Sequence, residues 1–204
     1  LEFRTLAHTI LGASSEPVQG ELFGEPVKET VQKEEKEYKV ADHDINSTPH
    51  QYQLIQTKLE IDSLKEILKK ATLISFDTET TGIDANQAEL VGMSFCIKEK
   101  EAYYVPIPAG QEKAKAMVNE FKSILEDSSK KFIGQNIKYD MLMMKWYGVQ
   151  IPEPEFDTMI AHYLLEPDLR HKLDYLAEAY LNYKMVAIEE LIGKKGVSQG
   201  SMRD

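Results

Sequence analysis

The sequence predicts an α/β domain built around one mixed sheet. An apolar run over residues 73–82 ends in two carboxylates and a glycine turn, the pattern of a buried central strand. Two more strand patterns, over 89–98 and 102–107, are joined by a short charged connection, so we expect an antiparallel meander. A helical spacing over 111–126 then leads into a short apolar strand at 131–133, which predicts a parallel crossover onto the same sheet.

Apolar residues at helical spacing predict further helices before and after these strands. One covers about residues 61–70 and delivers the chain into the central strand. The others are expected from Ile137, from about residue 156 to Leu165, from Leu173 to Leu181, and from Ile188 to Ile192. The first strand is therefore expected near the middle of a sheet flanked by helices.

Asp77 and Glu79 close the central strand. Successive side chains of a strand point to opposite faces, so two carboxylates spaced two apart project the same way. Like charges held this close repel unless a cation bridges them, which makes the pair a candidate for half of a divalent-metal site. The alternative is an ordinary acidic corner between a strand and a turn, and an isolated Asp-x-Glu does not choose between the two.

A second chemical element runs from Gly134 to Asp140. Gly134 ends a strand, and Asn136 can cap the helix that follows. Asp140 falls in the first turn of that helix, beside the ends of both strands, where ligands bind in open sheets. The alternative is that Asp140 only complements the dipole of its helix. Because Asp140 and the pair Asp77 and Glu79 are expected at the same sheet edge, the sequence favours a common site.

Length and composition indicate one globular domain with an additional segment. The chain has 204 residues, of which 42% are hydrophobic and 28% charged. It contains neither about 18 consecutive apolar residues nor a basic-then-apolar leader, so we expect no membrane span and no secretion signal. Its one cysteine, Cys96, cannot form an internal disulfide, which fits the cytoplasm. The net charge of −10 argues against a surface that binds nucleic acid mainly through basic residues, but not against binding a few nucleotides through metal ions.

The first fifty residues differ in pattern from the rest. Residues 1–12 carry apolar residues at helical spacing up to a glycine, and they resemble the end of a preceding domain. Residues 13–50 have little periodicity and hold nine acidic residues and four lysines, a net charge of −5. We expect an acidic flexible linker over 13–50 and a folded domain over 51–204.

One basic cluster, Arg170 to Lys172, follows the carboxylate motifs. Arg170 is a candidate phosphate contact, with a solvated loop as the alternative. His162 and His171 match no metal-ligand spacing, so structural or exposed roles are expected for both.

Three motifs occur in a fixed order: Asp-Thr-Glu-Thr-Thr-Gly at 77–82, Gly-Gln-Asn-Ile-Lys-Tyr-Asp at 134–140, and Phe-Asp-Thr-Met at 156–159. Together they closely resemble the proofreading 3′–5′ exonuclease domain of bacterial DNA polymerase I, a member of the DEDD nuclease superfamily. The resemblance covers roughly residues 52–195. It implies a ribonuclease H-like fold, with a mixed five-stranded sheet that begins as an antiparallel meander and continues with parallel strands. It also implies that residues 1–12 end a 5′-nuclease-like domain.

The resemblance also implies the site and its partners. Asp77, Glu79 and Asp140 would be catalytic ligands of two Mg²⁺ or Mn²⁺ ions, used to hydrolyse the terminal phosphodiester at the 3′ end of single-stranded DNA. The polymerase and 5′-nuclease domains of the same parent chain would be its neighbours, in a monomer. Five more positions match family residues that bind the substrate: Thr80 and Ile83 at the terminal nucleotide, Asn136 and Tyr139 along the single strand, and Arg170 near the incoming strand.

The third motif of the family, Tyr-x-x-x-Asp, does not follow the second in this chain. The one match, Tyr38 to Asp42, precedes the first motif, and we interpret it as chance. The chain stops at Asp204, about where the helix carrying the third motif is expected. We therefore expect a fragment that cleaves weakly or not at all.

Three other interpretations remain open. An RNA-trimming exonuclease like ribonuclease D would use the same metal chemistry and differ in accepting the 2′-OH. A catalytically dead exonuclease fold could serve as a scaffold in the polymerase, although carboxylates buried together speak against a purely structural role. The last is an unrelated α/β domain with coincidental motifs, which the placement of both carboxylate motifs at strand or helix ends opposes.

Overall fold

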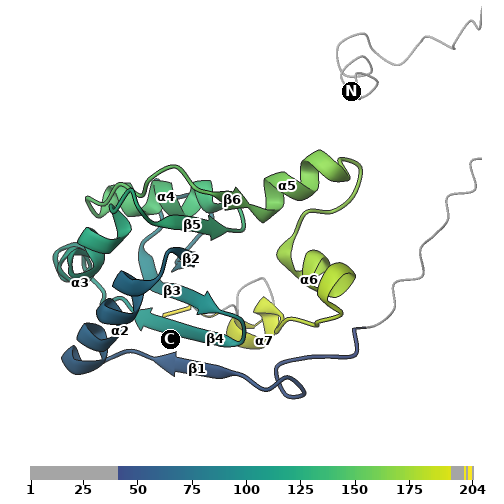
Figure 1. The fold of residues 1–204 in the computed structure, drawn as a ribbon, viewed down its shortest axis with the longest axis horizontal. Helices are drawn as coiled ribbons and strands as arrows, with labels where there is room; N and C mark the ends of the chain where they lie inside the picture. The colour runs from purple at the N-terminus through teal and green to yellow at the C-terminus, as the bar shows by residue number, and fades with distance from the viewer. Residues whose placement is uncertain (1–40, 194–199, 201, 204) are drawn as a thin grey trace, which may run out of the picture. The chain divides into compact units, whose positions relative to one another are not determined.

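The computed structural model describes residues 41–193, 200 and 202–203 (Figure 1). The predicted helical end at 1–12 and most of the predicted linker lie outside the described residues. The elements are β1 Gln51–Leu54, α2 Lys58–Lys70, β2 Leu73–Thr80, β3 Leu90–Lys98, β4 Glu101–Pro106, α3 Gln111–Leu125, β5 Lys131–Gly134, α4 Ile137–Trp146, β6 Phe156–Asp157, α5 Thr158–Leu165, α6 Leu173–Leu181 and α7 Ile188–Ile192.

The strands form one mixed sheet in the order β1-β4-β3-β2-β5-β6. β2 pairs antiparallel with β3 and parallel with β5, and β3 pairs antiparallel with β4, as the sequence predicts. The α/β fold class is confirmed, but the sheet has six strands where five were expected. The edge strands β1 and β6 add parallel pairs. All four residues of β1 are exposed and β6 has only two residues, so neither strand has a buried face long enough to reveal it in the sequence.

Two helices begin at residues other than those predicted, and both differences come from caps. α2 begins at Lys58 because Thr57 and Glu60 form a capping box, in which each side chain accepts a hydrogen bond from the backbone of the other. α5 was expected from about residue 156. It begins at Thr158 because Phe156 pairs as a strand and Asp157 is the N-cap.

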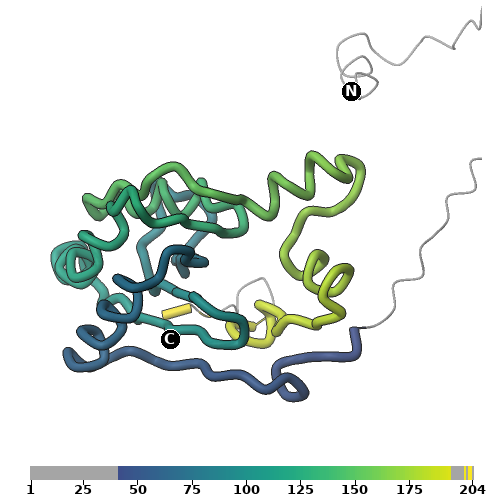
Figure 2. Tube along the Cα trace, in the orientation of Figure 1, coloured from purple at the N-terminus to yellow at the C-terminus, as the bar shows by residue number. Residues whose placement is uncertain are grey.

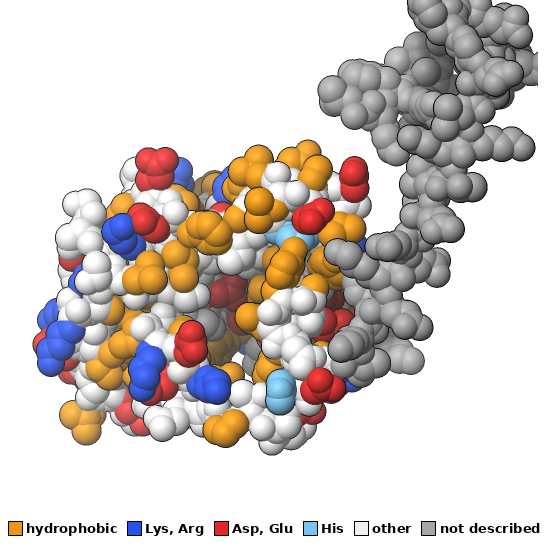
Figure 3. Space-filling model, turned by 45° about the vertical axis from the view of Figure 1, so that its right-hand side comes forward, with side chains coloured by type: hydrophobic (Ala, Val, Ile, Leu, Met, Phe, Trp, Pro, Cys, Tyr) orange, Lys and Arg blue, Asp and Glu red, His pale blue; other side chains and the backbone are white. Residues whose placement is uncertain are grey.

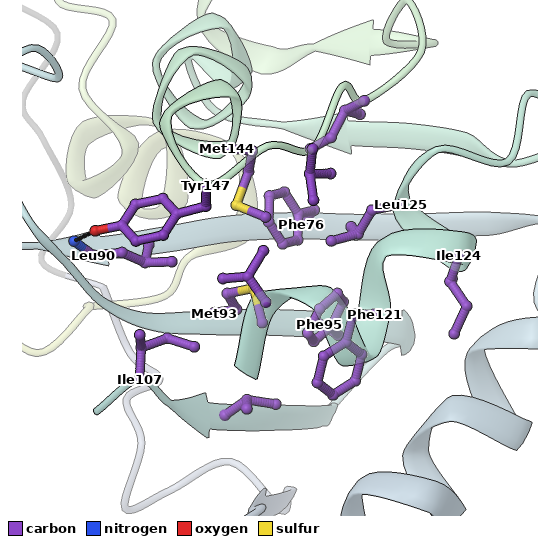
Figure 4. Packing of buried hydrophobic residues seen from close by; sticks show 14 of the residues in the cluster. Phe76, Leu90, Met93, Phe95, Ile107, Phe121, Ile124, Leu125, Met144 and Tyr147 are labelled. Atoms are coloured by element: carbon purple, nitrogen blue, oxygen red, sulfur yellow. Dashed lines mark hydrogen bonds between the residues drawn. The ribbon is translucent and has the colours of Figure 1, made fainter. Parts of the chain in front are cut away.

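The core lies on one face of the sheet, under α2, α3 and α4 (Figure 4). β2 contributes Ile74 and Phe76 to this face, and Phe76 lies with its ring centroid 5.3 Å from that of Phe95 on β3. The hydroxyl of Tyr147, just after α4, accepts a hydrogen bond of 2.9 Å from the Leu90 N–H, which joins the helix to β3. Apolar residues at every second position of β2 therefore fix which face the intervening residues use.

The described chain begins beside α6 (Figure 2). The Asp42 N–H donates to the Asn182 side-chain oxygen over 3.0 Å, and the Asn182 amide donates to the Asp42 carboxylate over 3.0 Å. His43 forms a parallel bridge with Tyr183. Asp42, part of the chance match to the third motif, is thus engaged at the end of α6. None of the described helices is both long enough and apolar enough to cross a membrane.

Candidate functional site

Asp77 and Glu79 come from alternate positions of β2 that do not face the core. In the register with β3, Asp77 lies opposite Ser94 and Glu79 lies opposite Gly92. Residues directly opposite in a ladder share a face, so small or polar residues surround the pair. Asp77 is exposed and Glu79 is half-buried. Figure 3 shows acidic side chains inside a hollow of the surface.

Asp140 reaches the same strand from the helix layer. It lies in the first turn of α4 and is 2% exposed. The N–H of Thr78 donates to Asp140 Oδ1 over 2.8 Å, and the Thr78 hydroxyl donates to the same oxygen over 2.5 Å. An Asp that only complemented its helix dipole would not need these bonds to β2. They hold Asp140 against the strand segment that carries Asp77 and Glu79.

The surroundings of the three carboxyl groups disfavour their charged forms. Burial raises the pKa of Asp140 to about 7; the Thr78 hydrogen bonds oppose this and the charge of Asp77 adds to it. Asp77 is exposed as a whole residue, but partial desolvation of its carboxyl group raises its pKa, and the hydrogen bond from the Thr78 N–H opposes this rise. Burial and then the charge of Asp77 raise the pKa of Glu79. Asp77 therefore acts on both other groups, and a cation beside it would stabilise all three charges.

The donor chemistry of this group fits a hard divalent cation. Carboxylate oxygens are the ligands that Mg²⁺ and Mn²⁺ prefer. Among the residues that the structure describes, no three His, Cys, Asp or Glu side chains lie close enough together to hold a metal ion. Mg²⁺ usually takes one or two carboxylates and completes its shell with water and substrate phosphates. Asp77 and Glu79 can thus form the protein part of such a site, with Asp140 held against the same strand.

Thr80 and Tyr139 contact each other at the end of β2. Their hydroxyl oxygens lie 2.8 Å apart. Both hydroxyls also donate to the carbonyl of Gly82, over 2.7 Å from Thr80 and 2.6 Å from Tyr139. These bonds anchor the loop that follows β2. On this loop, Ile83 is 98% exposed, so its apolar side chain is open to a ligand.

Asn136 occupies the N-cap position of α4, as predicted, but its side chain makes no capping hydrogen bond. Its backbone is left-handed, with φ 56° and ψ 39°, whereas a side-chain cap needs an extended backbone at this position. The expectation that the Asn136 side chain caps the helix is therefore wrong. Its backbone turns the chain sharply from β5 into α4, and Asn tolerates this conformation better than most residues.

Asp157 supplies the cap, and it serves two helices. Its carboxylate accepts N–H bonds from Asn136 (3.1 Å) and Ile137 (3.0 Å) at the start of α4. It also accepts from Met159 (2.9 Å) and Ile160 (3.1 Å) at the start of α5. Both helix dipoles favour a negative charge at this point. No role was predicted for Asp157, although an Asp directly before an apolar helical run is a known N-cap signal.

Arg170 lies in the exposed loop between α5 and α6. Within the described residues, no hydrogen bond or ion pair links Arg170 to the carboxylate group. The neighbouring His171 contacts His162 with their Nδ1 atoms 2.7 Å apart, and His162 is 5% exposed. A structural role is therefore confirmed for His162, and the two imidazoles join α5 to the loop that follows it.

Comparison with known proteins identifies the family. The sequence model of the 3′–5′ exonuclease family matches residues 52–199. The chain belongs to this family. It is 43% identical over 146 residues to DNA polymerase I of Borreliella burgdorferi, and 37% identical over 152 residues to DNA polymerase I of Pseudomonas aeruginosa. Each match covers 70% of the chain, but only 16% and 17% of these relatives. Membership of the family implies a nuclease that uses a divalent metal.

Solved structures support the fold of the exonuclease domain. Mg²⁺-bound NrnC of Brucella melitensis superposes with a TM-score of 0.54 at 21% identity, covering 74% of this chain and 70% of that one. The polymerase domain of Pol1 from M. smegmatis, in complex with DNA, also gives 0.54, at 18% identity, with 66% and 23% covered. At these identities the likeness shows the ribonuclease H-like fold alone. The named sequence relatives are DNA polymerases, so the RNA-trimming alternative gains no support from them.

Proposed function

We propose that this domain removes nucleotides from the 3′ end of single-stranded DNA by hydrolysing the terminal phosphodiester. One observation carries the proposal: the paired carboxylates of Asp77 and Glu79 lie on a strand to which the buried Asp140 is hydrogen-bonded through Thr78. A divalent cation would stabilise the charged forms of these three carboxylates, and the family to which the chain belongs uses one. The relatives named DNA polymerase I favour DNA as the substrate.

Asp77, Glu79 and Asp140 would hold two Mg²⁺ or Mn²⁺ ions through their carboxylate oxygens. Bound ions of this kind lower the pKa of water and stabilise charge on the attacked phosphate and its leaving oxygen. Asp140 must lose its proton to contribute its charge. The two donors of Thr78 occupy Oδ1 and stabilise the charged form of Asp140.

The residues around the carboxylates would position the strand. Ile83 would contact the terminal nucleotide, on a loop that Thr80 and Tyr139 anchor through Gly82. Asn136 and Tyr139 would line the path of the single strand. Arg170, exposed beyond α5, would meet the phosphates of the incoming strand.

The parent protein would be a monomeric cytoplasmic DNA polymerase in which this domain removes misincorporated nucleotides. The relatives support this, since the chain matches about a sixth of their length. The polymerase and 5′-nuclease domains of the same parent would then be its neighbours, with residues 13–50 as the linker. The sequence contains no Tyr-x-x-x-Asp after its second motif. We therefore expect slow cleavage by these 204 residues, and faster cleavage by a chain extended through the next helix of the parent.

Digestion of 5′-labelled single-stranded DNA and matched RNA in Mg²⁺ or Mn²⁺ tests the proposal. The proteins are the chain, an extended chain, and both with Asp140→Ala; Asp62→Asn, an exposed change on α2, is the control. Metal-dependent shortening of DNA that only Asp140→Ala abolishes supports the proposal. A preference for RNA moves the protein to the RNA-trimming class. If the folded, extended chain digests neither DNA nor RNA, the catalytically dead scaffold is the interpretation that remains.

A further inference from the structure

Tyr104 on β4 shares a sheet face with the carboxylate pair. It lies opposite Ser94 on β3, and Ser94 in turn lies opposite Asp77 on β2. The next residue back, Tyr103, lies opposite Phe95 on the core face and is 6% exposed. Tyr104 is half-buried on the face of the site, in none of the three motifs.

Gly92 lets the Tyr104 ring lean toward β2. A Cβ atom built on Gly92 would lie 2.1 Å from the Tyr104 hydroxyl oxygen and 2.3 Å from the ring carbon that bears it. Real Cβ contacts are essentially never shorter than 3.0 Å. Gly92 adjoins a register shift between Glu79 and Thr80, but its φ is not positive, so glycine is needed there for close approach rather than for a left-handed backbone. The Tyr104 hydroxyl thus occupies the space that a side chain at position 92 would take.

This position places the hydroxyl at the register position opposite Glu79. Glu79 lies directly opposite Gly92, and the Cβ positions of such a pair are about 5 Å apart. A hydroxyl at the Gly92 Cβ position is therefore within reach of the Glu79 carboxylate. No hydrogen bond among the described residues engages the Tyr104 hydroxyl.

We propose that Tyr104 is a positioning residue: its hydroxyl donates a hydrogen bond to the Glu79 carboxylate when that carboxylate binds a divalent metal ion, and Gly92 provides the space. The inference rests on the proposed function, because it requires a metal at Glu79. A carboxylate has two oxygens, so one can bind the ion while the other accepts from the phenol. Loss of such a partner typically costs about 10–100-fold in metal affinity or activity.

Mn²⁺ binding by the whole 204-residue chain, followed by electron paramagnetic resonance without DNA, tests this inference. Tyr104→Phe keeps the ring over Gly92 and removes only the hydroxyl. It should weaken Mn²⁺ binding by about tenfold or more. Tyr103→Phe is the matched control, since it removes a hydroxyl from the same strand on the core face, and it should bind Mn²⁺ like the wild type. Equal binding by Tyr104→Phe and the wild type overturns the inference.

Asp77→Asn separates this inference from the proposed function. Loss of Mn²⁺ binding in Asp77→Asn with normal binding in Tyr104→Phe overturns the role of Tyr104 alone. Binding that Asp77→Asn does not change, or no binding by the wild type, overturns the metal site and the inference together.

Gly92→Ala tests the close approach. In the wild-type background, the new methyl group should displace the Tyr104 ring and weaken Mn²⁺ binding. In the Tyr104→Ala background the ring is absent, so Gly92→Ala should cause little further loss of binding. Equal, additive losses in both backgrounds contradict the role of Gly92.

Discussion

The two faces of the central sheet differ in what their side chains do. On the core face, Phe76 packs against Phe95 (Figure 4). The Phe76 ring also contacts the ring of Phe132 on β5. On the other face, the neighbouring Asp77 and Glu79 stand without an ion-pair partner among the described residues. A single strand therefore contributes Ile74 and Phe76 to the core and Asp77 and Glu79 to the site. Substitutions one residue apart should separate the two properties.

The largest effect is expected from the matched pair Phe76→Ala and Asp77→Asn. Phe76 is 1% exposed, so its truncation should lower the free energy of unfolding by about 3–5 kcal/mol. Asp77→Asn removes a charge that its surroundings disfavour, as the raised pKa of Asp77 indicates, so stability should be unchanged or higher, while digestion falls by at least about a hundredfold. Urea denaturation and DNA digestion of both variants measure this. Similar destabilisation by the two changes would contradict the division between the faces.

Asp140, at the boundary between the faces, should make stability depend on pH. Its pKa is raised to about 7 in the folded protein, above an ordinary value of 3.8. Between these values the folded state binds more protons than the unfolded state, so stability should fall as the pH rises from about 4 to 7. Asp140→Asn should flatten this dependence. Thermal melts of the wild type and Asp140→Asn across that pH range, without divalent metal, measure this dependence. If the two proteins show the same change of melting temperature with pH, the prediction for Asp140 is wrong.

A smaller effect is expected for Asp157, because it acts through two helix ends. Asp157→Ala leaves four N–H donors without their acceptor, and should lower stability by about 1–2 kcal/mol. DNA digestion by Asp157→Ala should fall by more than the loss of folded protein accounts for, because the first turn of α4 carries Asp140. Thr57→Ala, which removes the cap of α2 far from the site, is the control. If both variants retain equal activity, Asp157 acts only as a cap.

The smallest effect is expected on the outer surface of the helix layer, where charges are paired. Hydrogen bonds from Lys65 and Lys58 lower the pKa of Glu120 to about 2, opposite to the shifts of the site carboxylates. Glu120→Gln should cost less than about 1 kcal/mol at neutral pH, since these ion pairs lie at the surface, where solvent screens them. This contribution should disappear as the pH falls from about 4.5 to 2 and should weaken in salt. Urea denaturation across this pH range, at low and at high salt, checks both predictions.

The sequence predicts those parts of the fold that have a buried face. β3 and α3 begin or end within one residue of their predicted bounds, and α6 matches fully, because alternation or helical spacing records their burial. The strand β1 has only exposed residues and gains its place by pairing with β4. Its four residues alternate between polar and apolar types, but this pattern is too short to distinguish an edge strand from a loop.

The site is predictable to the extent that it depends on one element. Asp77 and Glu79 follow from strand alternation alone. The bond between Asp140 and Thr78 depends on how α4 packs on β2, and the double cap by Asp157 depends on two helices starting side by side. Tyr104 reaches Glu79 only through the register of three strands. Such contacts join residues that no local pattern relates.

The carbonyl of Gly82 accepts hydrogen bonds from both Thr80 and Tyr139. These hydroxyls thereby use the hydrogen atoms with which they could have recognised the edge of a particular base. The exposed Ile83 beside them offers an apolar contact that any base can make. If the end of a DNA strand lies against this loop, as proposed, the terminal nucleotide is bound without regard to its identity. The four nucleotides should then leave at similar rates, as removal of every kind of mismatch requires.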